Sequence, residues 1–191
     1  RFTLAALAAQ GRDIRLSESR IEGYRNFMNK IWNAARFALP YLDSGEGLPA
    51  INELKSPSLP EQWILSRLNA TVREAREAIE TYRFNDAAQA LYHFTWHEFC
   101  DWYIEQTKIP LSGEDSVAAT RSAAVLRHVL DSLMRLLHPF IPFITEEVAS
   151  KIPSNGSTVI NGPFPAVDAA LDNPEAERKM GTLMGLISAV R

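Results

Sequence analysis

Apolar residues recur at spacings of three and four over much of the chain, and each such stretch predicts an amphipathic helix. The clearest stretch covers residues 20–39, and we expect its apolar face to be buried. Pro40 ends this predicted helix, because proline lacks the backbone N–H that a helix interior needs. The apolar stripe consists of Ile21, Tyr24, Met28, Ile31, Ala35 and Ala38.

The same spacing predicts further helices, separated by glycine and proline. Ser58 and Glu61 form a capping box before a helix that reaches about Tyr82. Asn85 is expected to cap the next helix, whose aromatic part should be central to the core, with Trp102 and Trp32 both buried. Ser17 is expected to cap the helix over 20–39, and an opening helix is predicted before Gly11. Other predicted elements are a break at Pro110, a helix over 117–137 begun by Ser112 and Asp115, a short helix over 143–152, a strand over 158–160 and a helix from Pro174.

Long helices joined by breaks, with little strand signal, predict an all-α fold. We expect an antiparallel helical bundle with a short C-terminal strand and helix extension. At 191 residues and 46% apolar content, the chain is long enough to bury a sizeable core. The expected organisation is a helix and connector over residues 1–16, the bundle over 17–152 and the start of a further module over 153–191.

Charge and cysteine content narrow the class of protein. A formal net charge of −3 argues against a general coat for nucleic acids, which needs a strong basic excess. The stretch from Arg12 to Arg36 nevertheless holds six basic and three acidic residues, so a polyanion is expected there. Cys100 is the only cysteine, which fits a reducing compartment such as the cytoplasm.

A second stripe on the helix over 20–39 is polar. Asn26, Lys30, Asn33 and Phe37 lie within about 40° of one another on a helix of 3.6 residues per turn. Two amides, an ammonium group and a ring are the groups that hold an unstacked single-stranded loop of nucleic acid. The alternative is a merely solvated face, with Phe37 in the core.

Three potential metal ligands also share a helix face. His93, His97 and Cys100 follow one another at i, i+4 and i+7, a spacing that can present ligands to zinc. The HEFCD run lacks the second histidine of an H-E-x-x-H site, since Asp101 stands in its place. We therefore expect no metal site, and interpret both histidines as partly exposed polar residues.

Several longer runs carry a resemblance to a known family. They are RFTLA, GRDIRLSESRIEGYRNFMNKIWNAARF, WILSRLN, YRFNDAAQALYHFTWHEFCDWYIE and LHPFIPFITEEV. With these runs the chain resembles the anticodon-binding region of valyl-tRNA synthetases, which are class I aminoacyl-tRNA synthetases. Related isoleucyl, leucyl and methionyl enzymes share a looser version of this pattern, and a bundle that docks onto a protein partner is a further alternative.

The resemblance implies an enzyme that activates valine with ATP and Mg²⁺ and transfers it to its tRNA. The catalytic and editing portions of that family have no counterpart in these residues, so the chain itself is expected to need no cofactor and to have no catalytic residue. Its expected partners are the anticodon loop of valine tRNA and a catalytic domain of the same polypeptide, in a monomer without membrane contact.

The resemblance also assigns roles in the anticodon site. Phe37 is expected to stack on an unpaired base, and Lys30 and Arg36 to engage phosphate or base acceptors. Asn26 or Asn33 pairs with a base edge, while Glu105 accepts from an exocyclic amine of adenine or cytosine. The remaining expected contacts are an apolar wall from Ile104 and a backbone contact from Arg20.

Overall fold

The structure is a computed structural model that describes residues 1–8, 17–42, 47–153 and 158–190. These residues form an all-α bundle, as predicted, and no β-strand occurs among them. The elements in chain order are α1 (Phe2–Leu7), α2 (Glu18–Ala38), η1 (Leu39–Tyr41), η2 (Ile51–Glu53), α3 (Leu59–Glu80), α4 (Phe84–His93), η3 (Phe94–Tyr103), α5 (Ile104–Ser112), α6 (Ser116–Leu137), α7 (Pro142–Ala149), η4 (Val159–Asn161), η5 (Ala169–Leu171) and α8 (Pro174–Val190).

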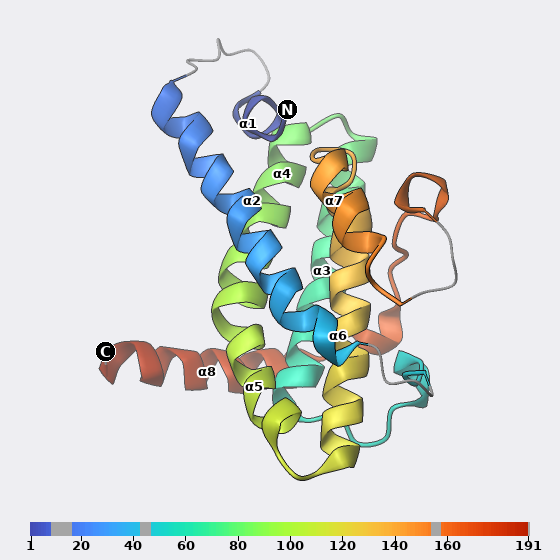
Figure 1. The fold of residues 1–191 in the computed structure, drawn as a ribbon. Coiled ribbons are helices and arrows are strands. Elements are labelled where there is room, and N and C mark those ends of the chain that lie inside the picture. The colour runs from blue at the N-terminus through green and yellow to red at the C-terminus, as the bar shows by residue number, and fades with distance from the viewer. Residues whose placement is uncertain (9–16, 43–46, 154–157, 191) are drawn as a thin grey trace.

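The long helices run lengthwise around one hydrophobic core (Figure 1). α4, η3 and α5 follow one another without a break and form one long helical rod beside α3. α2 crosses this rod, and α8 lies across the lower half of the bundle, with its C-terminal end projecting sideways beyond it (Figure 1). The largest fully buried side chains include Phe27, Phe94, Phe99, Tyr103, Ile64, Leu91 and Leu133.

The buried stripe of α2 differs in part from the predicted one. Ile31, Ala35 and Ala38 are buried as expected, whereas Ile21 is 47% exposed. Phe27 is fully buried instead, with its ring 5.1 Å from that of Phe2 and 4.8 Å from that of Tyr92. The first turns of α2 lean away from the bundle, so burial begins only where α1 and α4 reach the helix (Figure 1).

The helix ends follow the predicted signals unevenly. Ser58 and Glu61 form the predicted box, and the backbone N–H of Ser58 donates to Glu61 Oε2 over 2.6 Å. Asp115, rather than Ser112, caps α6 by accepting from the backbone N–H of Val117 and Ala118. Ser17 is at the N-cap position of α2 without a capping side-chain bond, and α4 begins at Phe84, so Asn85 is not its cap.

The aromatic stretch is helical, but over Phe94–Tyr103 it is a π-helix rather than an α-helix. Its wider turn buries Tyr103 fully and leaves Trp102 only half-buried. α5 then continues through Pro110 to Ser112, so the predicted break comes two residues late. Trp32 is 37% exposed, because it points away from the face of α2 that carries Phe27, and its predicted burial was wrong.

The C-terminal part joins the same core. Ala176 and Met180 of α8 are buried against α3, and the Asn69 amide of α3 donates to the Asp168 carbonyl. The prediction of a strand over 158–160 was wrong: the 3-10 turn η4 (Val159–Asn161) lies there, and the described part of the chain holds no second strand with which its backbone could pair. The division into residues 1–16, 17–152 and 153–191 stays a prediction, and the connector predicted over 11–16 lies outside the described residues.

No helix among the described residues is long and apolar enough to cross a lipid bilayer.

Candidate nucleic-acid interface

The polar stripe of α2 lies on the open side of the bundle. Asn26 and Asn33 are exposed, as are Arg20 and Arg36. Lys30 and Phe37 are half-buried, because each lies against the rod formed by η3 and α5. The face predicted to stay accessible is therefore accessible. Lys30 and Phe37 on this face are held by contacts with η3 and α5.

Lys30 is held from two sides by η3. Its ammonium group pairs with the Asp101 carboxylate and lies 4.2 Å from the centroid of the Trp96 ring. The side chains of Lys30 and Asp101 keep 26% and 39% of their exposure, so water and solutes reach the pair. A cation over an indole ring gains about 0.5–1 kcal/mol at such a site.

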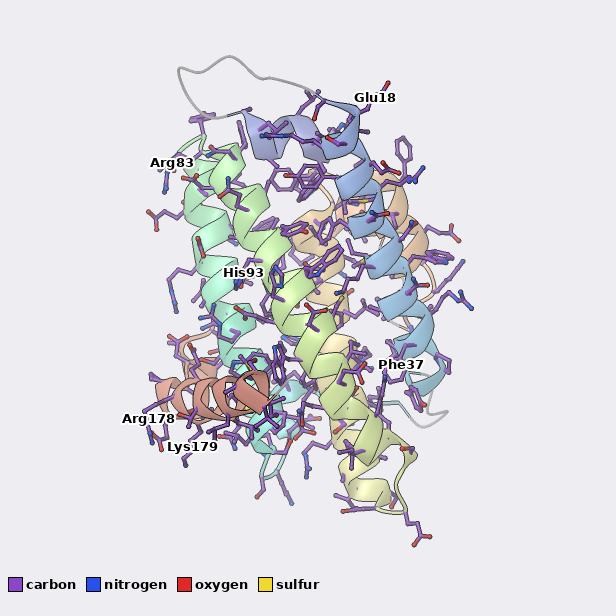
Figure 2. All side chains as sticks on the ribbon, turned by 90° about the vertical axis from the view of Figure 1, so that its left-hand side faces the viewer. Glu18, Phe37, Arg83, His93, Arg178 and Lys179 are labelled. Atoms are coloured by element: carbon purple, nitrogen blue, oxygen red, sulfur yellow. The ribbon has the colours of Figure 1, made fainter. Side chains whose placement is uncertain are left out.

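Phe37 forms a second cluster, about two helical turns beyond Lys30 on the same helix. Its ring centroid lies 5.5 Å from that of Tyr41 and 6.0 Å from the Lys108 ammonium group of α5. Lys108 in turn pairs with Glu105 over 2.7 Å. Figure 2 shows Phe37 at the edge between α2 and the rod. Lys108 thus lies near both Phe37 and Glu105, and the base contacts expected of these two residues stay predictions.

Two of the predicted site residues stand apart from these clusters. Ile104 is 6% exposed and belongs to the hydrophobic core, so its side chain is not free to form a wall for a base. Arg20 precedes Phe37 by 17 positions on α2, or about 25 Å at 1.5 Å per residue, which places it at the far end of the helix.

Sequence reasoning missed four residues of this surface. Trp96 and Asp101 hold Lys30, and Lys108 and Tyr41 flank Phe37. Trp96 and Asp101 are five residues apart, which an α-helix places on different sides, so only a π-helical spacing would have paired them. Lys108 follows Glu105 by three residues, and this pairing was visible in the sequence.

The three side chains considered as metal ligands have other surroundings: His93 and His97 each lie beside a carboxylate, and Cys100 is largely buried. His93 Nδ1 lies 3.3 Å from Glu98 Oε1, and His97 Nδ1 lies 3.5 Å from Asp101 Oδ2. Burial raises the pKa of the Cys100 thiol to about 12, so it is protonated at neutral pH. Within the described ranges no three or more His, Cys, Asp or Glu side chains are grouped to hold a metal ion.

The surface combines stacking planes with balanced charge. Each of the ammonium groups of Lys30 and Lys108 has a carboxylate partner, so neither attracts a polyanion with its full charge. Aromatic rings beside such cations offer sequence-tolerant stacking, and exposed amides such as Asn33 offer base-edge hydrogen bonds. The arrangement suits a few unstacked bases better than a long phosphate backbone.

Comparison with known proteins gives a consistent result. The profile of the family described as "Anticodon-binding domain of tRNA ligase" matches residues 61–191. Over its full length the chain is 47% identical to a valine–tRNA ligase of Syntrophotalea carbinolica and 48% identical to one of Geobacter sulfurreducens. The chain spans 22% of the length of each of these relatives.

A solved structure shares the fold. It is described as the ternary complex of Agrobacterium radiobacter K84 agnB2 LeuRS-tRNA-LeuAMS, and 91% of the present chain superposes on 20% of that chain with a TM-score of 0.69 and 23% identity. Because the family profile covers most of the sequence, including the whole of the rod and α8, the chain belongs to the family of anticodon-binding domains of tRNA ligases.

Proposed function

We propose that this chain is the tRNA anticodon recognition module of a valine–tRNA ligase. Family membership supports tRNA as the class of ligand. Similarity to valine–tRNA ligases over all of the present chain supports the choice of valine. The single observation that carries the choice of surface is the placement of Lys30 and Phe37, half-buried and adjacent to η3 and α5 on an otherwise open face.

Each residue of this surface has a separate role in the proposal. Phe37 stacks on an unpaired base, a contact of about 1–3 kcal/mol. Lys30 exchanges Asp101 for a phosphate or a base acceptor, and Glu105 accepts from an exocyclic amine of adenine or cytosine. Asn26 and Asn33 read base edges. Arg36 and, at the far end of α2, Arg20 contact the backbone of the RNA.

The activity of the whole enzyme is part of the same proposal. Such a ligase activates valine with ATP and Mg²⁺ and charges valine tRNA in the cytoplasm. Its catalytic portion would be joined to the present residues in one polypeptide, and the 191 residues alone are expected not to charge tRNA. Their contribution is to bind the anticodon loop and so to select the tRNA.

The test is a titration of the chain with anticodon stem-loops of valine tRNA. We expect substitutions at the last two anticodon positions, A and C in valine tRNA, to weaken binding by about tenfold each, which is about 1.4 kcal/mol per position. Equal affinity for all loops would contradict anticodon recognition. No affinity for any RNA would favour the alternative of a bundle that docks onto a protein.

A further inference from the structure

The π-helix η3 pairs residues that are five positions apart. Trp96 and Asp101 both contact the Lys30 ammonium group, and His93 at the end of α4 pairs with Glu98 of η3 over 3.3 Å. Five residues is the spacing at which a π-helix closes its backbone hydrogen bonds, and π-helical segments are often found at functional sites. The contacts around Lys30 therefore depend on this register.

The angles between side chains about the helix axis show why these contacts depend on the register. At about 100° per residue, an α-helix would place Trp96 and Asp101 about 140° apart, so one ammonium group would not meet both. With its i→i+5 bonds, a π-helix turns by roughly 80° per residue and brings the two side chains to within about 40° of each other. The same change separates Glu98 from Asp101, from about 60° to about 120°, so that they face α3 and α2 respectively.

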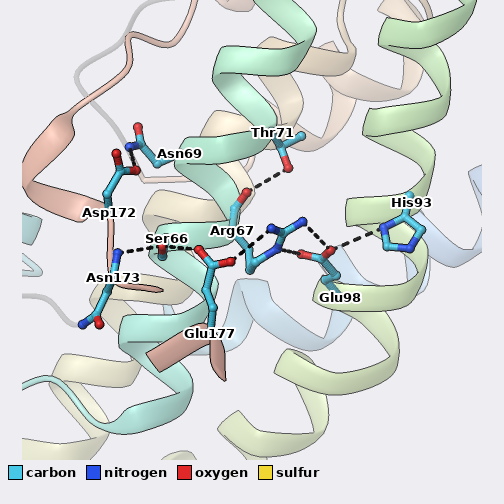
Figure 3. Close-up of polar contacts among 9 residues, drawn as sticks. All are labelled: Ser66, Arg67, Asn69, Thr71, His93, Glu98, Asp172, Asn173 and Glu177. Atoms are coloured by element: carbon cyan, nitrogen blue, oxygen red, sulfur yellow. Dashed lines mark hydrogen bonds and ion pairs between the residues drawn. The ribbon is translucent and has the colours of Figure 1, made fainter. Parts of the chain in front are cut away.

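Glu98 anchors the inner side of this helix. Its carboxylate accepts two hydrogen bonds from the Arg67 guanidinium of α3, from Nε over 2.9 Å and from Nη2 over 3.0 Å (Figure 3). Its side chain is only 9% exposed, and its bond to Arg67 is the chief reason why the pKa of Arg67 is raised. Arg67 Nη1 also donates to Glu177 of α8 over 3.2 Å. A bidentate pair of this kind fixes orientation as well as distance.

We propose that the Arg67–Glu98 ion pair holds η3 in its π-helical register and thereby positions Trp96 and Asp101 around Lys30. Arg67 and Glu98 are thus positioning residues for anticodon binding, although Glu98 faces Arg67 of α3 rather than Lys30 of α2. The part of this inference that concerns RNA rests on the proposed function, whereas the part that concerns the register does not.

The register is tested without RNA. The Trp96 ring shifts the resonances of the Lys30 methylene protons in an NMR spectrum, because the ammonium group lies over the ring, and Trp96→Leu identifies this shift. In the double variant Arg67→Met, Glu98→Met, which leaves no unpaired charge of this pair, we expect most of the shift to be lost. The control Arg73→Met breaks a different ion pair between α3 and the C-terminal part, with Asp172, and should keep the shift.

The effect on RNA is tested by combining variants. Lys30→Ala and the double variant are each expected to weaken binding of the anticodon stem-loop by about tenfold, the size of one hydrogen bond to a charged group. Because both act on the same contact, the triple variant should bind as weakly as either and no weaker. Arg73→Met should bind like the unmodified chain.

Distinct results would overturn the two parts. An unchanged Lys30 shift in the double variant, or losses that multiply in the triple variant, would contradict positioning through Lys30. If Lys30→Ala alone leaves RNA binding unchanged, the proposed function is contradicted. The Lys30 shift in the double variant then still tests whether the Arg67–Glu98 pair holds the register of η3. Should the double variant not fold, Glu98→Leu serves in its place, because it removes both acceptors and leaves Arg67 paired with Glu177, and an unchanged shift in that variant would equally refute the proposal.

Discussion

Lys30 of α2 and Asp101 of η3, 71 positions apart in the sequence, form an ion pair on the open side of the bundle. The pair neutralises the cation at the centre of the proposed interface, so an RNA phosphate must compete with a carboxylate that is already in place. Such competition lowers affinity for every RNA and leaves base contacts to decide which loop binds. This agrees with the net charge of −3 of a protein proposed to bind RNA.

Replacement of Asp101 by asparagine should free this cation from its competing carboxylate while Trp96 still holds it in position, whereas the Arg67→Met, Glu98→Met variant displaces Trp96 as well. We predict that Asp101→Asn binds matched and mismatched loops more tightly, with a smaller ratio between them. The slope of log K against log[salt] should steepen by about 0.7, the value for one additional contact to a single-stranded phosphate. Dissociation constants at several salt concentrations measure both quantities.

A matched control removes one negative charge elsewhere. Glu147→Gln on α7 breaks the exposed pair with Lys151 and should leave the salt slope unchanged. If Asp101→Asn and Glu147→Gln behave alike, the effect comes from net charge, and Asp101 has no special role at Lys30.

Phe37 provides a test of stacking. We predict that Phe37→Ala weakens loop binding by about 1–3 kcal/mol, the value of a base stacked on an aromatic ring. Because the ring is only half-buried, the thermal midpoint should fall by less than about 5 °C. Phe37→Leu keeps much of the apolar contact but removes the ring, so it should bind nearly as weakly while melting close to the unmodified chain. A large fall in the midpoint with unchanged binding would make Phe37 a core residue.

Much of the fold could be predicted, because helix periods and breaks are local signals. The capping box at Ser58, the end of α2 before Pro40 and the cap at Asp115 are all set within a few residues. The exposure of Ile21 could not be predicted, because it depends on where α1 and α4 end in space. Phe27 was missed for the same reason, since its partners Phe2 and Tyr92 come from other helices.

The candidate site was harder to predict than the fold. The polar stripe of α2 follows from helical spacing, and the structure leaves it open. The partners of Lys30 depend on the π-helical register of η3, which no local propensity of this aromatic stretch indicates. If an α-helix is assumed, Trp96 and Asp101 lie on different sides of it, so their shared contact with Lys30 could not be predicted from the sequence.

Phe27 and Ile21 form a matched pair for stability. Phe27 is fully buried among the rings of Phe2 and Tyr92, so Phe27→Ala should cost about 3–5 kcal/mol through lost burial and a cavity. Ile21→Ala, on the exposed start of the same helix, should stay within about 0.5 kcal/mol. Urea denaturation followed by circular dichroism measures both. Comparable losses would mean that the start of α2 is covered in solution.

Cys100 gives a prediction on pH dependence. Burial raises the pKa of its thiol to about 12 in the folded chain, whereas an unfolded thiol ionises near about 8.5. Between these values the folded chain holds a proton that the unfolded chain has lost, so this contribution to stability is complete below about pH 8.5 and declines as the pH rises toward 12. Cys100→Ala lacks this contribution, so its unfolding free energy should fall less steeply than that of the unmodified chain between about pH 8.5 and 10.5. Other groups that titrate at alkaline pH, such as Tyr103, affect the unmodified chain and Cys100→Ala equally. If the unfolding free energies of the two proteins, measured by urea titration, fell in parallel with pH, the thiol would not titrate as its burial implies.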